Sequence, residues 1–312
     1  MDNTPLVTIC CITYNHAAYI RECLNGFLMQ ETNFKFEVVI HDDASTDETQ
    51  SIIKEYCEKY PNVFSPIFQH VNQYSKGIKS IIQTFCVPQF RGKYIAMCEG
   101  DDYWIDPYKL QKQVDIMENN PNCSLVISNG ISLNEITKKQ YIINPMGDIK
   151  KSGFISPNLV LLERRLIPTA SMFYRKDQSK MPDFFRNCPV GDRPLRLWLL
   201  SKGDIYYFAN PMIMYREQSN GSFGQRVCSS FKYAKDIYDG MIAFYNNYNE
   251  FTKYKYNKEI QYLKSQDEYS FYVRTKQIKE SMNTTYFKNL PLTIKLKRRI
   301  KYWIKTIIFH KI

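Results

Sequence analysis

The stretch YIAMCEGDDYW, residues 94–104, decides the fold. Its apolar first half has the length and composition of a buried strand. The strand runs into three carboxylates, Glu99, Asp101 and Asp102, with Gly100 between them. Because open α/β sheets bind their ligands at the carboxyl ends of the strands, this turn is the first candidate for a site.

Three carboxylates this close repel one another when all are ionised, unless a cation lies among them. Hard oxygen ligands suit Mg²⁺ or Mn²⁺, which take some of their ligands from water and from a substrate's phosphates. The turn therefore indicates a site for a metal ion and a diphosphate. Taken alone, such a turn is more often an acidic surface turn that binds nothing.

The chain before this stretch alternates strand and helix. Residues 6–13, LVTICCIT, are apolar without alternation, which is typical of a central parallel strand buried on both faces. Two further strands are predicted at residues 36–40 and 63–68, and helices at residues 17–29, 48–60 and 78–90. The sequence thus predicts an α/β fold: a doubly wound, Rossmann-like, mostly parallel sheet with helices on both faces.

Polar turns also follow the first two strands. The first strand ends in TYNH and the second continues into HDDASTDET. Ser45, Thr46 or Asp47 can cap the helix that follows, but capping does not account for Asp42 and Asp43. Since parallel strands of one sheet end at the same edge, we expect the two acidic turns to lie together.

The rest of the chain is less regular. A helix is predicted over residues 106–118, a strand over 123–128, a loop or hairpin over 129–156, the start of a helix at 157–162 and a strand pair over 204–214. Asp192 follows Gly191 at the start of an amphipathic helix. N-capping, which stabilises by about 1 kcal/mol, would explain this Asp. It is also a suitable proton acceptor beside a cation-neutralised acidic cluster.

These motifs resemble the family two glycosyltransferases of the GT-A fold. The resemblance covers residues 7–222 and rests on VTICCITYN, VVIHDDASTDET and GKYIAMCEGDDYW. It implies metal-dependent transfer of a hexosyl or N-acetylhexosaminyl group from a nucleotide-diphosphate donor, a UDP-sugar, to a glycan or lipid-linked acceptor. The wider family inverts the anomeric configuration, and the implied role is in cell-surface polysaccharide synthesis.

The resemblance also implies roles for single residues. Tyr14 and Asp42 would contact the base of the donor, Asp101 with Glu99 would hold Mg²⁺ or Mn²⁺, and Asp192 would be the general base. The full predicted donor site is Thr13, Tyr14, Asn15, Asp42, Asp43, Glu99 and Asp101.

Two positions near residue 217 are candidate phosphate contacts. Arg216 is equally suited to a salt bridge at the edge of the core. Gln218 stands where many relatives carry a His in the pattern Tyr-Arg-x-His. Two further departures from the family are Glu99 as the first acid of the metal motif and a Gly-poor loop at residues 72–77.

The charge is concentrated at the C-terminus. The formal net charge of the chain is +11. Residues 293–312 hold seven Lys and Arg and no acid, so most of the excess positive charge lies there. Leu296, Ile300, Trp303, Ile304 and Ile307 form an apolar stripe there, typical of an interfacial helix on an anionic membrane. A helix docked on the core is the alternative. We therefore predict a catalytic domain at 1–224, a helical extension at 225–290 and a basic amphipathic tail at 291–312.

Nine cysteines without CxxC spacing predict reduced thiols, and neither a signal peptide nor a run of ~20 apolar residues is expected. The predicted location is cytoplasmic and peripheral at the inner face of the cell membrane. Two other classes stay open. One is a phosphate-receiver or phosphohydrolase-type metal-binding domain, although its nucleophile turn is not present after the first strand. The other is a non-catalytic module for nucleic acid or an anionic surface, although no nucleic-acid-binding motif is found and nucleic acid is not expected as a partner.

Overall fold

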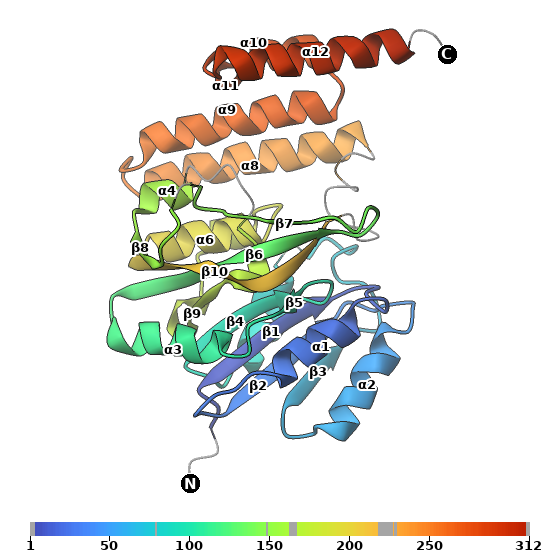
Figure 1. Ribbon diagram of the computed structural model, residues 1–312, viewed down its shortest axis with the longest axis vertical. Coiled ribbons are helices and arrows are strands. Elements are labelled where there is room, and N and C mark those ends of the chain that lie inside the picture. Colours follow the sequence, from blue (N-terminus) through green and yellow to red (C-terminus); the bar gives the residue numbers. More distant parts are fainter. Residues whose placement is uncertain are drawn as a thin grey trace. The chain divides into compact units, whose positions relative to one another are not determined.

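The computed structural model describes residues 4–78, 80–147, 149–161, 167–217, 227 and 230–309, with side chains as far as residue 300. The chain divides into two compact units, residues 1–220 and 221–312 (Figure 1). The further border predicted at residue 290 stays a prediction.

The described part of the first unit forms one ten-stranded sheet in the order β3-β2-β1-β4-β9-β6-β10-β5, with β7 beside β6 and β8 beside β10. Parallel pairs join β1 (Val7–Thr13), β2 (Phe36–Asp42), β3 (Phe64–Phe68) and β4 (Tyr94–Glu99). A second parallel pair is β6 (Cys123–Asn134) with β10 (Asp204–Glu217). The predicted mostly parallel α/β sheet is therefore confirmed.

Short antiparallel strands complete the sheet. They are β5 (Tyr103–Trp104), β7 (Gln140–Ile142), β8 (Gly153–Ile155) and β9 (Phe173–Arg175). Because β9 runs antiparallel to both β4 and β6, the strands β6 and β10 point the same way as β1. All six long strands therefore end at one edge.

The helices of the first unit are short. They are α1 (Ile20–Leu28), α2 (Thr49–Lys59), α3 (Lys109–Asn119), α4 (Pro157–Leu161), α5 (Asp183–Arg186) and α6 (Asp192–Leu200). Single turns of other helix types are η1 (Ile82–Cys86), η2 (Val87–Gln89), η3 (Thr169–Ser171) and η4 (Lys176–Ser179). Helices α1 and α2 cover one face of β1 to β3 (Figure 1).

Two predicted elements differ from the structure, each at a proline. The helix expected over residues 78–90 is a π-helical turn followed by a 3₁₀ turn that contains Pro88, which has no N–H for an α-helical hydrogen bond. The strand pair expected over 204–214 is the single strand β10, whose register shifts on both sides of Pro211. A proline is accommodated at such a bulge because no ladder bond is needed there.

The core of the first unit forms around β1 and β4, whose side chains are almost all buried. Trp104 of β5 packs on Phe27 of α1, with ring centroids 4.8 Å apart, and its indole N–H donates to the Ala170 carbonyl at 3.1 Å. A Cβ at Gly26 would lie 2.9 Å from the Trp104 backbone nitrogen, so α1 approaches β5 only because residue 26 is a glycine.

The second unit is helical, as predicted. Its helices are α8 (Phe231–Phe251), α9 (Asn257–Arg274), α10 (Ile278–Asn283), α11 (Thr285–Lys288) and α12 (Leu292–Phe309). Between α9 and α10 the chain passes through Lys276, whose φ is 62°. Within the described residues, no helix is long and apolar enough to cross a membrane. Each of the eight described cysteines is a free thiol.

Lys109, in the first turn of α3, is fully buried. Its Nζ lies 4.0 Å from the centroid of the Trp104 ring and donates to Gln113 Oε1 at 2.9 Å. Burial lowers the pKa of this ammonium from its usual value to about 7. The aliphatic part of the side chain therefore packs in the core, and the amine loses its proton far more easily than that of an exposed lysine.

We predict that the free energy of unfolding of the wild-type protein increases between about pH 7 and pH 10, and that Lys109→Met removes this increase. The pKa of an unfolded lysine is about 10.4. Between the two pKa values the unfolded chain binds more protons, so wild-type stability should increase by up to about 1.4 kcal/mol per pH unit. Urea unfolding followed by Trp fluorescence at pH 7, 8 and 9 measures this slope. The exposed Lys139→Met is the control and should keep it. An unchanged slope in Lys109→Met would contradict the assignment.

Candidate active site

The ends of three neighbouring strands bring the predicted polar turns together. In the parallel register Thr13 at the end of β1 stands opposite Asp42 of β2, and Ile12 stands opposite Glu99 of β4. Asp42 is the last residue of its strand, and Asp43 is the first residue of the turn. The expectation that the two acidic turns share one edge of the sheet is confirmed.

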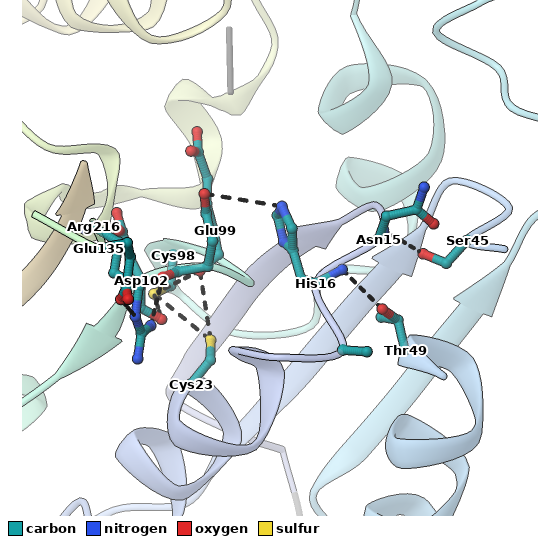
Figure 2. A network of polar contacts seen from close by, with 12 residues as sticks. Asn15, His16, Cys23, Ser45, Thr49, Cys98, Glu99, Asp102, Glu135 and Arg216 are labelled. Carbon is teal, nitrogen blue, oxygen red and sulfur yellow. Dashed lines mark hydrogen bonds and ion pairs between the residues drawn. The ribbon is translucent and has the colours of Figure 1, made fainter. Parts of the chain in front are cut away.

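The turn after β2 holds the turn after β1 by its backbone. Three consecutive N–H groups, those of Asn15, His16 and Ala17, donate to Ser45 Oγ (2.8 Å), Thr49 Oγ1 (2.9 Å) and Asp47 Oδ2 (3.0 Å). Figure 2 shows the first two of these contacts. In return, Asn15 Oδ1 accepts the N–H of Thr46 at 2.8 Å. Asn15 has φ 56°, a left-handed conformation that asparagine tolerates better than most residues. We call this set of contacts the turn clamp.

The clamp changes the interpretation of the predicted helix caps. Glu48 is the N-cap of α2 and its side chain makes no capping bond. Instead Asp47, the residue before the N-cap, accepts the N–H of Thr49 at 3.0 Å. The Ser, Thr and Asp residues of this turn therefore act mainly across to β1, and only Asp47 also serves the helix.

The two acids predicted to bind the donor after β2 have internal partners. Asp42 is fully buried and accepts from the Ser45 N–H (2.9 Å), the Ser45 hydroxyl and Gln50 Nε2 (2.6 Å). Asp43 accepts the backbone N–H groups of Gln73 (2.7 Å) and Tyr74 (3.1 Å). One carboxylate thus supports the clamp and the other ties down the Gly-poor loop at residues 72–77.

The turn after β4 lies against the turn after β1 with no room for a side chain at residue 100. A Cβ at Gly100 would lie 2.7 Å from Thr13 Oγ1 and 3.0 Å from His16 Nδ1. Both of these atoms are buried and have no hydrogen-bond partner among the described residues. Because buried polar atoms are normally paired, they mark a position where a ligand or water completes the site.

The three acids after β4 divide into two kinds. Asp102 is 1% exposed, and its Oδ1 accepts the backbone N–H of Arg216 at 2.8 Å. Burial, and then the charges of Asp101, Cys98 and Glu99, raise the pKa of Asp102 well above its usual value. Glu99 and Asp101 stay in partial contact with solvent. Asp102 therefore supports the turn, and the other two can reach a ligand.

Arg216 braces this turn from β10. Its guanidinium is 2% exposed, forms ion pairs with Glu22 and with Glu135 (2.8 Å), and donates to the Asp101 carbonyl at 2.6 Å. Figure 2 shows Arg216 beside Glu135 and Asp102. Burial lowers its pKa to about 10, so it is charged at neutral pH. The predicted salt bridge is present, whereas the phosphate contact stays a prediction. Gln218 lies outside the described residues.

His16 was given no role by the sequence analysis. Its Nε2 lies 3.9 Å from Asp101 Oδ2, with both side chains about 15% exposed. Burial lowers the pKa of this imidazole, against the opposing effect of Asp101, Asp47 and Asp42. Its position next to Asn15 in TYNH was the one available signal. Tyr14, by contrast, is 38% exposed.

Asp192 is the first residue of α6. The N-cap position is occupied by Gly191, which has no side chain to cap the helix. Near the other end of α6, the Leu199 carbonyl accepts from Ser124 Oγ (2.8 Å) at the start of β6. The C-terminal end of α6 therefore lies beside the start of β6. The capping alternative would need Asp192 one position earlier.

The residues present fit a divalent cation that the substrate helps to hold. No three His, Cys, Asp or Glu of the described chain form a complete cage. Mg²⁺ commonly binds through one or two carboxylates and the phosphates of a substrate, which matches Glu99 and Asp101 at the strand end. The unpaired Thr13 and His16 atoms beside them are the observation that favours an added ligand.

A mostly parallel open sheet with polar turns gathered at the carboxyl edge defines a nucleotide-binding type of α/β protein. Comparison with known families narrows this class. Residues 8–190 match the model of Glycosyl transferase family 2, and the chain belongs to that family.

A curated relative is an uncharacterized protein of Mycobacterium tuberculosis, 33% identical over 242 residues, which are 76% of this chain and 66% of the relative. The matched segment thus spans about two thirds of that protein's length. Among solved structures, S. aureus TarS 1–349 in complex with UDP-GlcNAc is similar with a TM-score of 0.59 and 17% identity, covering 95% of this chain and 92% of that chain.

The mannosyltransferase PcManGT from Pyrobaculum calidifontis, in complex with GDP-Man and Mn²⁺, is similar with a TM-score of 0.57 and 13% identity. It covers 88% of this chain and 75% of that one. These likenesses establish the GT-A fold.

Proposed function

We propose that the protein transfers a sugar from a nucleotide-diphosphate sugar, a UDP-sugar, to a hydroxyl of a glycan or lipid-linked acceptor in cell-surface polysaccharide synthesis. The observation that carries the proposal is the acidic turn at residues 99–102, packed against the TYNH turn at the carboxyl edge of a sheet within the family match. The UDP-GlcNAc bound by TarS supports a UDP donor, and the transferred group would be a hexosyl or N-acetylhexosaminyl unit.

In this proposal the donor lies across the edge. Thr13 at the end of β1, and Tyr14 and Asn15 in the turn after it, would line the donor site. The exposed Tyr14 ring would be available to the base. Asp42 and Asp43 are proposed to contact the donor while they hold the clamp and the loop at residues 72–77. Asp101 and Glu99 would hold Mg²⁺ or Mn²⁺, and PcManGT with Mn²⁺ supports this assignment.

The bound cation would offset the negative charge that develops on the leaving diphosphate. Asp192 would accept the proton of the acceptor hydroxyl as that oxygen attacks the anomeric carbon. The glycosidic bond to the diphosphate breaks as the new bond forms, and one such displacement inverts the anomeric configuration. Arg216 is assigned to bracing the Asp101 turn, with a phosphate contact as its second proposed role.

Asp101→Ala should abolish metal-dependent UDP binding and lower transfer by at least about a hundredfold, because the cation contributes several kcal/mol of charge stabilisation. The fold should persist, since this side chain lies at the end of the sheet. UDP release from UDP-sugars with and without EDTA, together with the melting temperature, measures both. Asp236→Ala, an exposed acid of α8, is the control. Transfer by Asp101→Ala near the wild-type rate would refute the metal assignment.

Asp192→Asn should retain UDP binding and stability but lose turnover by about 10²- to 10⁴-fold, the usual contribution of a general base. Single-turnover transfer and UDP titration separate these effects. Asp183→Asn changes the first residue of the neighbouring helix α5 in the same way and should be fully active. An active Asp192→Asn enzyme would leave this residue without a catalytic role.

We further propose that α12 lies on an anionic membrane surface, peripheral at the cytoplasmic face of the cell membrane. Leu292, Leu296 and Ile300 occupy one stripe of the helix and are 71%, 48% and 55% exposed. Arg298 is turned the other way, with its guanidinium 4.8 Å from the centroid of the Tyr269 ring on α9. A cation–π contact thus holds the helix to its own unit while the apolar stripe faces outward.

The double variant Leu296→Glu, Ile300→Glu should lose sedimentation with phosphatidylserine vesicles and keep its melting temperature, because both side chains are exposed. Wild-type binding should weaken with rising salt, since Lys and Arg near an anionic leaflet contribute about 1 kcal/mol each. Ile136→Glu is the control, because Ile136 is 73% exposed in the β6–β7 connection. Equal sedimentation of the double variant would exclude this surface.

A further inference from the structure

We infer that His16 is a ligand of the divalent cation, through Nε2, together with Asp101. This inference rests on the proposed metal-dependent function and adds a residue to it. Neither the sequence motifs nor the family resemblance assigned His16 a role.

The first argument is position. Nε2 of His16 and Oδ2 of Asp101 are 3.9 Å apart, too far for a direct hydrogen bond. Neighbouring ligands at about 2.1 Å from one octahedral ion are about 3.0 Å apart. One cation can therefore bind both atoms after a side-chain shift of about 1 Å.

The second argument is that backbone hydrogen bonds position His16, while its Nε2 contacts Asp101 Oδ2 at 3.9 Å. The His16 N–H is bound by Thr49 Oγ1, and its carbonyl accepts the N–H groups of Tyr19 and Ile20 at 2.8 Å. Nδ1 is buried against Gly100 and has no hydrogen-bond partner among the described residues. The backbone clamp thus positions a ring whose Nε2 is directed at the metal-binding acid.

Another histidine of the same sheet gives the contrast. His41, in β2, stacks on Phe85 with centroids 5.2 Å apart, and its Nε2 lies 3.2 Å from Gln69 Nε2. That ring is accounted for by packing and a side-chain partner. His16 contacts the Tyr19 ring edge-on at 6.5 Å between centroids and faces the Asp101 carboxylate at 3.9 Å.

The ligand set has a consequence for metal choice. Carboxylate, water and phosphate oxygens suit Mg²⁺ and Mn²⁺ alike, whereas an imidazole favours transition metals. With His16 in the coordination shell, the site should prefer Mn²⁺ over Mg²⁺. A cation held by oxygen atoms alone would discriminate less between the two.

The test is electron spin-echo modulation of Mn²⁺ bound with UDP to the full-length protein. Wild type should show modulation from a directly bound ¹⁴N, which changes to the ¹⁵N pattern when the protein is labelled with ¹⁵N-histidine. His16→Gln should lose the modulation, and the exposed His70→Gln should keep it. Mn²⁺ affinity should fall at least about tenfold in His16→Gln, with a smaller loss for Mg²⁺.

The labelling comparison uses the unmutated protein, so it stands even if His16→Gln folds poorly. Absence of a histidine nitrogen signal in wild type, or its persistence in a folded His16→Gln protein, would overturn the inference. Asp101→Ala separates the two proposals. If it binds Mn²⁺ and UDP like wild type, the metal assignment of the proposed function fails. If it loses binding while His16→Gln retains affinity and signal, only the role of His16 fails.

Discussion

The site depends on the turn clamp, in which side chains after β2 bind three consecutive backbone N–H groups after β1. A turn at the end of a parallel strand has N–H groups with no ladder partner, and leaving them unpaired in a part-buried place is costly. The polar residues of the ASTDET segment satisfy them from the neighbouring strand. In doing so they fix the left-handed Asn15 and direct His16 toward Asp101.

The need to pair backbone N–H groups also explains the buried carboxylates of this edge. Asp42, Asp43 and Asp102 are buried, and each accepts a hydrogen bond from a backbone N–H group: Asp42 from its own turn, Asp43 from the loop at residues 72–77 and Asp102 from β10. These acids keep the loops in register. Glu99 and Asp101 keep contact with solvent, so the buried acids also position the two that are most open to a ligand, as precise sites generally require.

The packing beneath the site explains why the acidic turn is stable despite its charge. Arg216 brings a buried cation to the Asp101 carbonyl, and Trp104 anchors β5 against α1 and η3. Gly26 permits the close approach of α1 to the backbone of Trp104 below the turn, and Gly100 permits the close approach of the turn to the Thr13 and His16 side chains. A side chain at either position would separate the elements that form the site.

The sequence by itself determined the α/β class, the edge of the sheet and the family, because strand patterns and motif spacing are local properties of the chain. It also located the acids of the turns after β2 and β4, but not Glu135, which follows β6 and pairs with Arg216. It could not separate the supporting Asp42, Asp43 and Asp102 from the accessible Glu99 and Asp101, since burial depends on which strands become neighbours. For the same reason the sequence assigned no role to His16 and could not decide between a salt bridge and a phosphate contact for Arg216. Only the tertiary structure set His16 Nε2 opposite Asp101 and enclosed Arg216 between Glu22 and Glu135, because these contacts join segments up to 194 residues apart.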